Sequence, residues 1–445
     1  MNNKDLSVFL RSLVTGVNTK VPLANGQYVT AVNFDNAATT PPFTSVMNDV
    51  VNYAPWYSSI HRGKGYKSKY SSKIYEEGRE VILEHVKGDS NNDVVIFTKN
   101  ATESINMLSY QLYQQDPDQV ILSTEMEHLA NDLPWRDKFK TDYVQVNEKG
   151  QLSLDDLESK LIRYKGKIKL VAVAGASNVT GIINPIHKIA SIAHQYGAKI
   201  LVDAAQLMPH IEIDIKPHFH DEHIDYLVFS AHKMYAPFGM GALIGPKEDL
   251  GKGKPIYHGG GAVRFACHGF IQWEDTPSKD EAGTPNIMGV KALTTAIQTL
   301  KNTGMKAIHE YENGLLRYTA RKLKGIHGIK LYGYDEKSSR VGVLSFNIEG
   351  MEHYMTAQIL SKEAGVAVRN GLFCSHQYVV KLLGLQSAEI QYYCDNPQVA
   401  LPGMVRISFG LYNNTYEIDQ FINMISRIVQ YKARYMRYYK NCKDD

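Results

Sequence analysis

Cysteine is scarce in this chain of 445 residues, and so is an excess of charge of either sign. The four cysteines are Cys267, Cys374, Cys394 and Cys442, and no two of them form a Cys-x-x-Cys pair. Their sparseness excludes a disulfide scaffold and favours a reducing, intracellular setting. The 49 Lys and Arg residues against 46 Asp and Glu leave a formal net charge of +3. This balance argues against nucleic acid or an anionic membrane as the main partner.

Long hydrophobic runs are also missing. The longest apolar stretches, such as LVAVAGA (170–176), fall far short of the roughly 18 to 20 apolar residues that a membrane span needs. Arg11 interrupts the apolar residues near the N-terminus, so no signal-peptide core is present. We expect a short amphipathic helix there and a cytoplasmic protein with no membrane partner.

Short apolar runs are present at intervals through the first two thirds of the chain. Each is rich in Val and Ile and ends in a polar or small residue: 93–98, 119–124, 168–175, 198–205 and 224–231. Runs that are apolar on both faces are typical of strands buried in a parallel sheet. Stretches with helical periodicity lie between them, at 102–115, 152–164 and 183–197. This alternation predicts an α/β fold, with a large domain over 33–290 built on a mainly parallel sheet flanked by helices.

After residue 291 the pattern changes. Helical stretches (291–325) lead into an alternating, half-buried strand (341–350), a helix near 352–364 and short strands at 366–370 and 405–410. We predict a smaller α+β domain made of 291–445 and 1–32. The closing segment, 431–445, mixes Tyr with Lys and Arg as a nucleic-acid patch does, but a fraying helix end is the simpler interpretation.

The segment SAHKMYAPFGMG (230–241) begins where a predicted strand ends and contains Lys233. Ligands of open α/β sheets bind at the carboxyl ends of strands. A lysine buried there has a lowered pKa, which suits it to forming a Schiff base. Ser230 and His232 beside it offer hydrogen bonds to a phosphate. A surface lysine on a loop is the alternative.

The segment VDAAQ (202–206) places Asp203 at the end of another apolar strand. A buried carboxylate needs a cationic partner, and the protonated nitrogen of pyridoxal phosphate is one such partner. Asp203 would equally serve as a helix cap. A lysine and an aspartate at neighbouring strand ends favour the cofactor.

Three further strand ends carry polar residues. TKNATES would present Asn100, Ala101 and Thr102 at the start of a helix, which is an anion site. EMEHLAN supplies His128, able to stack on a flat ring or move a proton, and GASNVTG supplies Asn178. Each signal is weak alone, because Asn and Thr are ordinary helix caps and a lone His is commonly structural.

One segment, HFHDEH (218–223), contains several residue types that bind metals. It lies in a polar connection with no matching Cys or His cluster elsewhere. We therefore expect a solvated loop and no metal site.

Taken in order, seven motifs resemble those of the class V (fold-type I) pyridoxal-phosphate enzymes. They are FDNAATT, EMEH, SNVTG, VDAAQ, SAHK, EAGTPN and RNGLFC, and the similarity runs from about residue 33 to residue 425. Within that class the sequence is most similar to the group II cysteine desulfurases and selenocysteine lyases.

The resemblance implies a pyridoxal 5'-phosphate site with one role for each matching residue. Lys233 would carry the cofactor as a Schiff base, and Asp203 would pair with the pyridine nitrogen. Gln206 would bond the ring oxygen, His128 would stack on the ring, and Asn178 would lie beside the ring. The phosphate would be held by Ala101, Thr102, Ser230 and His232. The threonine of EAGTPN, Thr284, would reach the phosphate of the neighbouring subunit, which implies a homodimer.

The resemblance also implies how a substrate is held. Asn178 and Arg406 match the positions that bind the substrate carboxylate, and a guanidinium suits that task because it meets a carboxylate with two parallel hydrogen bonds. His61 and Arg62 match the rim of the active site.

Cys374 lies five positions after Arg369, the spacing of the persulfide cysteine in this family. A free Cys is more often a small buried hydrophobe, but the polar loop NGLFCSHQ argues against deep burial here. The other cysteines have no comparable context. The implied reaction converts L-cysteine to L-alanine, with the sulfur passing to Cys374 and then to an acceptor protein.

Two features depart from the family pattern. The residues after Cys374 continue as a predicted helix, and the 32 positions from Cys374 to Arg406 include an insertion, QSAEIQYYCDNPQVALPG, at the mouth of the predicted site. Three alternatives therefore stay open: a carbon–sulfur lyase with Cys374 as a bystander, a class V aminotransferase acting on another amino acid, and an inactive cofactor-binding scaffold.

Overall fold

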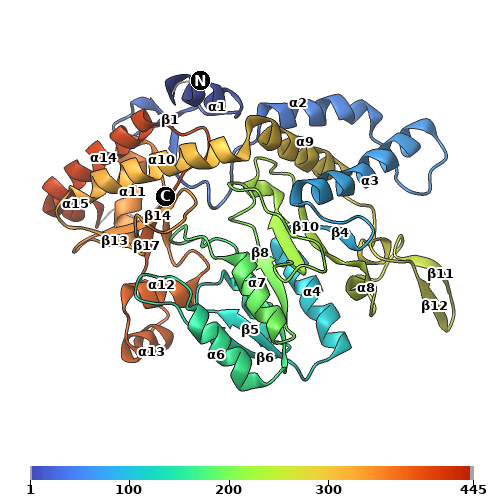
Figure 1. Ribbon diagram of the computed structural model, residues 1–445. Helices are drawn as coiled ribbons and strands as arrows, with labels where there is room; N and C mark the ends of the chain where they lie inside the picture. Colours follow the sequence, from blue (N-terminus) through green and yellow to red (C-terminus); the bar gives the residue numbers. More distant parts are fainter. Residues whose placement is uncertain (1–2, 441–445) are drawn as a thin grey trace.

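A seven-stranded sheet forms the centre of the larger part of the molecule. In the computed structural model, which describes residues 3–440, the strand order is β4-β10-β9-β8-β7-β5-β6 (Figure 1). The strands are β4 (Asp93–Thr98), β5 (Val120–Thr124), β6 (Lys140–Val144), β7 (Ile168–Ala174), β8 (Lys199–Asp203), β9 (Tyr226–Ser230) and β10 (Gly241–Pro246). Strand β10 runs antiparallel to both of its neighbours, and all the other pairs are parallel. The predicted α/β fold with a mainly parallel sheet is confirmed.

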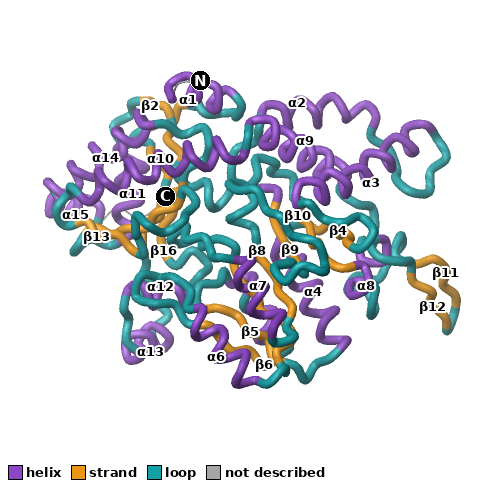
Figure 2. Tube along the Cα trace, in the orientation of Figure 1, coloured by secondary structure: helices purple, strands orange, loops and turns teal. Residues whose placement is uncertain are grey.

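Helices cover both faces of this sheet (Figures 1 and 2). Alternate residues of a strand point to opposite faces. Val94 and Ile96 accordingly belong to one hydrophobic cluster with residues of α4, α5 and α8, whereas Val95 and Phe97 belong to another that includes residues of α3, α6, α7 and α9. The helices are α2 (Thr44–Tyr53), α3 (Tyr66–Val86), α4 (Ala101–Gln115), α5 (Leu133–Arg136), α6 (Leu154–Tyr164), α7 (Ile186–Gln195), α8 (Lys247–Leu250) and α9 (Ile287–Thr303). Burial on both faces explains why the strands read as continuous apolar runs.

Short 3₁₀ turns and a projecting hairpin complete this part of the chain. The turns are η1 (Ala54–Trp56), η2 (Leu129–Asn131), η3 (Ala231–Lys233) and η4 (Ser278–Asp280), and the hairpin pairs β11 (Val263–Cys267) with β12 (Phe270–Trp273). Figure 1 shows the hairpin extending away from the sheet.

A second sheet, entirely antiparallel, has the order β13-β14-β17-β16. Its strands are β13 (Ile329–Tyr332), β14 (Val343–Ile348), β16 (Arg369–Gly371) and β17 (Met404–Ser408). The helices of this region are α10 (Met305–Lys324), α11 (His353–Ala364), α12 (His376–Leu383), α13 (Ser387–Asp395), α14 (Thr415–Gln430) and α15 (Lys432–Tyr439). The predicted smaller α+β region is present.

The N-terminal segment packs beside this second sheet. It contains α1 (Asn3–Ser12), the hairpin of β1 (Lys20–Pro22) with β2 (Tyr28–Thr30), and β3 (Val32–Asn33), which pairs in parallel with β15 (Val366–Ala367). Arg11 of α1 forms an ion pair of 2.6 Å with Glu417 of α14. The predicted amphipathic helix is confirmed, and it is attached to the C-terminal part of the chain.

Two predicted strands differ from the observed ones. The 341–350 segment is predicted to be half-buried, but in β14 every residue except Asn347 is buried. The loop that follows β7 contacts it there, since Ser345 donates a hydrogen bond to the Val179 carbonyl. The 366–370 segment is divided between β15 and β16, which belong to different sheets.

Strands β6 and β10 are absent from the predictions. The β10 segment GALIGP is bounded by Gly and Pro, which indicate a loop. A Cβ atom on Gly241 would lie 2.7 Å from the backbone of Asn100, so this glycine is needed where β10 passes the start of α4. Only the tertiary structure supplies that reason.

No helix among residues 3–440 combines the length and apolar character that crossing a membrane requires. The C-terminal helix end expected within 431–445 is observed as α15, and Cys442 lies outside the described residues.

Phe34 connects the segment that follows β3 to the smaller core. Its side chain is fully buried, and its ring meets Phe409 and Phe421 edge-on at 5.2 and 5.8 Å. Phe34→Ala should lower the free energy of unfolding by about 3 to 5 kcal/mol, because it leaves a cavity among well-packed rings. Urea-induced unfolding followed by circular dichroism measures this loss. Phe219→Ala is the matched control, since Phe219 is 88% exposed. Equal effects of the two substitutions would contradict this packing.

Candidate active site

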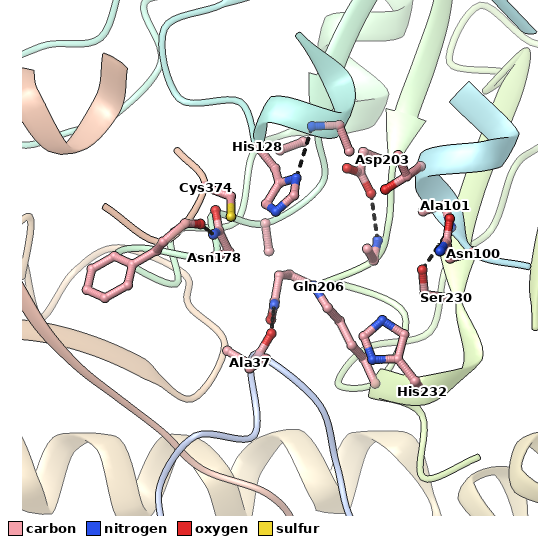
Figure 3. A pocket seen from close by; sticks show the side chains of 18 of the residues that line it. Ala37, Asn100, Ala101, His128, Asn178, Asp203, Gln206, Ser230, His232 and Cys374 are labelled. Carbon is pink, nitrogen blue, oxygen red and sulfur yellow. Dashed lines mark hydrogen bonds between the residues drawn. The ribbon is translucent and has the colours of Figure 1, made fainter. Parts of the chain in front are cut away.

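A cavity of about 280 Å³ opens at the carboxyl ends of the parallel strands. It collects twelve of the residues singled out in the sequence: Asn100, Ala101, Thr102, His128, Asn178, Asp203, Gln206, Ser230, His232, Lys233, Cys374 and Arg406. Figure 3 shows side chains from several strand ends pointing into the same space, with Cys374 entering from the C-terminal part of the chain. Residues far apart in the sequence therefore form one site.

The start of α4 provides an anion-binding corner. Asn100 caps the helix through its side chain, which accepts the Glu103 N–H at 3.0 Å, and the Ala101 N–H donates to the Ser230 hydroxyl at 2.8 Å. Thr102 is exposed in the first turn. Free N–H groups and the helix dipole make such a terminus attractive to a phosphate.

Asp203 is the last residue of β8, and Lys233 lies in the 3₁₀ turn that follows β9, the neighbouring parallel strand. Burial lowers the pKa of Lys233 to about 8, although the nearby Asp203 carboxylate acts in the opposite direction. Burial also raises the pKa of Asp203, while the Ala205 N–H, which donates to its carboxylate at 3.0 Å, and the Lys233 charge oppose that rise. The pocket thus holds an amine that loses its proton easily and a carboxylate that needs a cationic neighbour.

His128 is held in a defined tautomer. Its Nδ1 accepts the Ala130 N–H at 3.0 Å, and burial together with the charges of Lys233 and Arg406 lowers its pKa to about 4. A neutral imidazole whose Nδ1 accepts a hydrogen bond must carry its proton on Nε2. His232 is also neutral, because burial and the Lys233 charge lower its pKa to about 4.

Arg406 lies on β17 and is only 3% exposed. Its Nη1 donates to the Asn178 carbonyl at 2.9 Å, and its Nη2 donates to Asp35 at 3.0 Å. Its Nε is buried with no hydrogen-bond partner among the described residues. Sequence reasoning missed Asp35, although the residue stands in FDNAATT, because its role depends on an arginine 371 positions away.

Cys374 is exposed and lies in the turn between β16 and α12. Phe373 and Cys374 both have a left-handed backbone, with φ of 52° and 54°. A negative charge on Cys374 would act on both Lys233 and Arg406, since it raises the pKa of each. The polar-loop position predicted for Cys374 is observed.

Three predicted site residues lie outside this cavity. His61 Nε2 lies 3.0 Å from the Glu76 carboxylate, Arg62 donates to the Val263 carbonyl at 3.3 Å, and Thr284 is exposed on the loop before α9. The single chain brings none of them to the pocket. In the 218–223 segment, His218 contacts Asp93 at 2.8 Å, and no cluster of three or more potential ligands among residues 3–440 is arranged to hold a metal ion.

The candidate site is built on the seven-stranded sheet, with Lys233 and Asp203 near the ends of neighbouring strands and the start of α4 at the same cavity. The family model for class V aminotransferases matches residues 32–421, so the chain belongs to this family. Enzymes of the family depend on pyridoxal phosphate in general.

Within the family the chain resembles cysteine desulfurases. It is 32% identical to a cysteine desulfurase of Haloferax volcanii, over 88% of each chain, and 34% identical to a probable cysteine desulfurase of Staphylococcus aureus, over 89% of this chain and 92% of the relative. The apo structure of a cysteine desulfurase from Thermococcus onnurineus superposes with a TM-score of 0.80 at 29% identity, covering 90% of this chain and 95% of the other. An Escherichia coli cysteine desulfurase in its S-sulfonic acid form gives 0.79 at 25% identity, covering 95% and 98%.

The pocket fits pyridoxal phosphate. The corner at Ala101 and Ser230 supplies donors for a phosphate, and Gly241 leaves the room that the Asn100 backbone needs there. Asp203 supplies the buried carboxylate that a protonated ring nitrogen requires. Lys233 supplies an amine of lowered pKa in the same cavity.

The pKa of Lys233 leads to a testable pH dependence. An amine attacks an aldehyde only when it is unprotonated, so covalent uptake of pyridoxal phosphate by the apo protein should become faster as the pH rises to about 8 and then level off. Mixing experiments between pH 6.5 and 10, followed by absorbance, measure this rate. Lys233→Ala is the control and should lack the covalent signal. A rate that rises only toward pH 10.5, the ordinary lysine value, would contradict the burial of this amine.

Proposed function

We propose that this protein is a pyridoxal-phosphate-dependent cysteine desulfurase that converts L-cysteine to L-alanine and keeps the sulfur as a persulfide on Cys374. The observation that carries this proposal is the presence of an exposed thiol, Cys374, in the same cavity as Lys233 and Arg406. An aminotransferase needs no thiol at this place. The similarity to proteins named cysteine desulfurases supports the same conclusion.

The cofactor would be held by groups that the cavity already brings together. Lys233 would bind it covalently, and Asp203 would pair with its ring nitrogen. His128 would stack on the ring, Gln206 would bond the ring oxygen, and Asn178 would lie beside the ring. The phosphate would be surrounded by Ala101, Thr102, Ser230 and His232. Gln206 already donates one amide hydrogen to the Ala37 carbonyl at 2.6 Å and has a second to offer.

Lys233 would act as the base. With cofactor and substrate bound, the neutral Lys233 amine would take the proton from the substrate Cα, because its pKa of about 8 leaves a useful fraction unprotonated near pH 7 to 8. Bound pyridoxal phosphate supplies an electron sink for the electron pair released from Cα. Arg406 would orient the substrate by its carboxylate.

Cys374 would then receive the sulfur. Its thiolate attacks the substrate Sγ, so that a new S–S bond forms while the Cβ–S bond breaks. The substrate carbon skeleton takes up protons and leaves as alanine, and the extra sulfur stays on the enzyme. L-cysteine plus a thiol thus becomes L-alanine plus a persulfide, with no external oxidant or reductant. Because Cys374 is exposed, an acceptor protein would be able to take the sulfur from it.

The active unit would be a homodimer. Thr284, exposed and remote from its own cavity, would complete the phosphate site of the neighbouring subunit. His61 and Arg62 would lie at the rim of the active site. Residues 33–290 would form the cofactor-binding domain, and 1–32 with 291–445 would form the smaller domain that carries Cys374 and Arg406.

Product analysis with L-cysteine tests the reaction. The holoenzyme should release alanine and, with a reductant, an equal amount of sulfide. Pyruvate with ammonia would instead identify a carbon–sulfur lyase, and amino transfer to an added keto acid would identify an aminotransferase. The absence of any turnover would favour a scaffold.

Cys374→Ser isolates the sulfur step. The hydroxyl changes the volume little but removes most of the nucleophilicity, so the variant should bind cofactor and cysteine normally and form alanine at least 100-fold more slowly. Mass spectrometry of the wild-type protein after brief exposure to cysteine should find one added sulfur on the Cys374 peptide. Cys267→Ser is a matched control, since Cys267 is also an exposed free thiol, and it should behave as wild type. Near-normal turnover by Cys374→Ser would overturn the persulfide role.

Subunit mixing tests the shared site. Lys233→Ala and Thr284→Ala should each have low activity as homodimers, whereas a mixed dimer regains one site with both residues. Mixing the two variants under conditions of subunit exchange should therefore restore up to about a quarter of wild-type activity per total subunit. Exchange itself is measured by native mass spectrometry. Demonstrated exchange with no recovered activity would contradict a site shared between subunits.

A further inference from the structure

We propose that Asn178 and Ser375 are positioning residues that hold the Cys374 turn in the shape needed for sulfur transfer. The inference deepens the proposed function, on which its kinetic consequence rests. Asn178 was expected to contact the cofactor and substrate, and nothing in the sequence pointed to Ser375. Together the two side chains form what we call the turn clamp, a pair of hydrogen bonds across the base of the Phe373–Cys374 turn.

The turn needs holding because its backbone is unfavourable. Phe373 and Cys374 are consecutive, and both have positive φ, at 52° and 54°. Side chains with a Cβ atom rarely adopt this left-handed region, and a strained backbone persists only where its surroundings determine it. Two such residues in succession would relax to other conformations if the turn were free.

The turn clamp supplies this restraint from both sides of Cys374. The Asn178 Nδ2 donates to the Phe373 carbonyl at 2.8 Å, and the Ser375 hydroxyl donates to the Asn178 Oδ1 at 2.8 Å. Figure 3 shows Asn178 directly beside Cys374. One amide thus bonds the residue before the cysteine and the residue after it. Asn178 is 6% exposed and Ser375 is fully buried, so water competes little for these bonds.

A third hydrogen bond attaches Cys374 to the loop that contains His128. The Leu129 N–H, next to His128, donates to the Cys374 carbonyl at 2.7 Å. The turn is therefore anchored to two loops of the large sheet, those that follow β5 and β7.

Arg406 contacts the same unit. Its Nη1 donates to the Asn178 carbonyl at 2.9 Å, and its guanidinium lies 5.0 Å from the centre of the Phe373 ring. The turn clamp therefore joins the group proposed for the substrate carboxylate to the thiol proposed for the substrate sulfur. Ser375 itself is not among the residues that line the cavity, so it acts through Asn178 and not by touching substrate.

Ser375→Ala tests the turn clamp, because it removes one hydrogen bond and adds no bulk. In the holoenzyme kcat for alanine formation should fall between about 5-fold and 100-fold, since a displaced thiol attacks less efficiently. KM for cysteine should stay within about twofold, because Arg406 keeps its hydrogen bonds to the Asn178 carbonyl and to Asp35. Ser71→Ala is the matched control: Ser71 is also fully buried and bonds one side chain, Tyr53, at 2.6 Å, and its loss should leave kcat unchanged.

Hydrogen exchange gives a readout that does not depend on activity. In Ser375→Ala holoenzyme the Leu129 amide should exchange at least 5-fold faster than in the wild type, while peptides elsewhere in the large sheet stay unchanged. The Ser71→Ala protein should show no change at Leu129. Identical Leu129 exchange in Ser375→Ala and wild-type protein would overturn the turn clamp.

A double substitution separates a shared role from two independent ones. If Ser375 acts through Asn178, then Ser375→Ala should lower kcat no further in an Asn178→Ala background. Full additivity of the two losses would overturn the proposal. Failure of the proposed function can be told apart from failure of the turn clamp. Wild-type protein that forms no alanine would contradict desulfuration. Exchange of the Leu129 amide would still report whether the turn is held.

Discussion

The ion pair between Arg406 and Asp35 joins the two parts of this protein at the place where the cavity forms. Arg406 is almost inaccessible to water, and removing one partner of a buried pair leaves the other charge without solvation. Asp35 belongs to the segment between β3 and α2, and its backbone forms a bridge with Ser408, the last residue of β17. Neither sheet alone contains both charges. Arg406 thus connects β17 both to Asp35 and, through the Asn178 carbonyl, to the loop that follows β7.

The electrostatics of the pocket follow from the same burial. Charged groups in a site of low dielectric shift toward their neutral forms unless a partner opposes the change. Lys233 is moved to a pKa of about 8, and His128 and His232 to about 4, so both imidazoles are neutral at the pH of the cell. Arg406 stays charged beside Asp35, because burial lowers its pKa only from the very high value of a guanidinium. The site therefore contains a guanidinium, Arg406, that stays charged and can attract a carboxylate, and an amine, Lys233, that can gain or lose a proton near neutral pH.

The fold was predictable wherever local pattern and tertiary environment agree. The five apolar runs became β4, β5, β7, β8 and β9, because strands buried on both faces need continuous apolar sequence. Strand β10 was missed, since its glycines and proline indicate a loop and the need for Gly241 arises only from the approach of Asn100. The alternation in β14 suggested a solvated face, yet the loop that follows β7 covers it through contacts such as that of Ser345 with Val179.

The candidate site shows the same division between local and long-range information. Lys233, Asp203, His128 and Ala101 were predictable as neighbours, because each lies at the end of a strand or within four residues after it, and the carboxyl ends of parallel strands meet at one edge. The sequence by itself thus determined the chemistry of the site and the residues of the large sheet that carry it. The tertiary structure alone decided which group Arg406 pairs with, that Asn178 bonds the cysteine turn through Phe373 and Ser375, and that Thr284 lies outside the cavity of its own chain. These contacts connect residues up to 371 positions apart, and no local pattern encodes a partner at that distance.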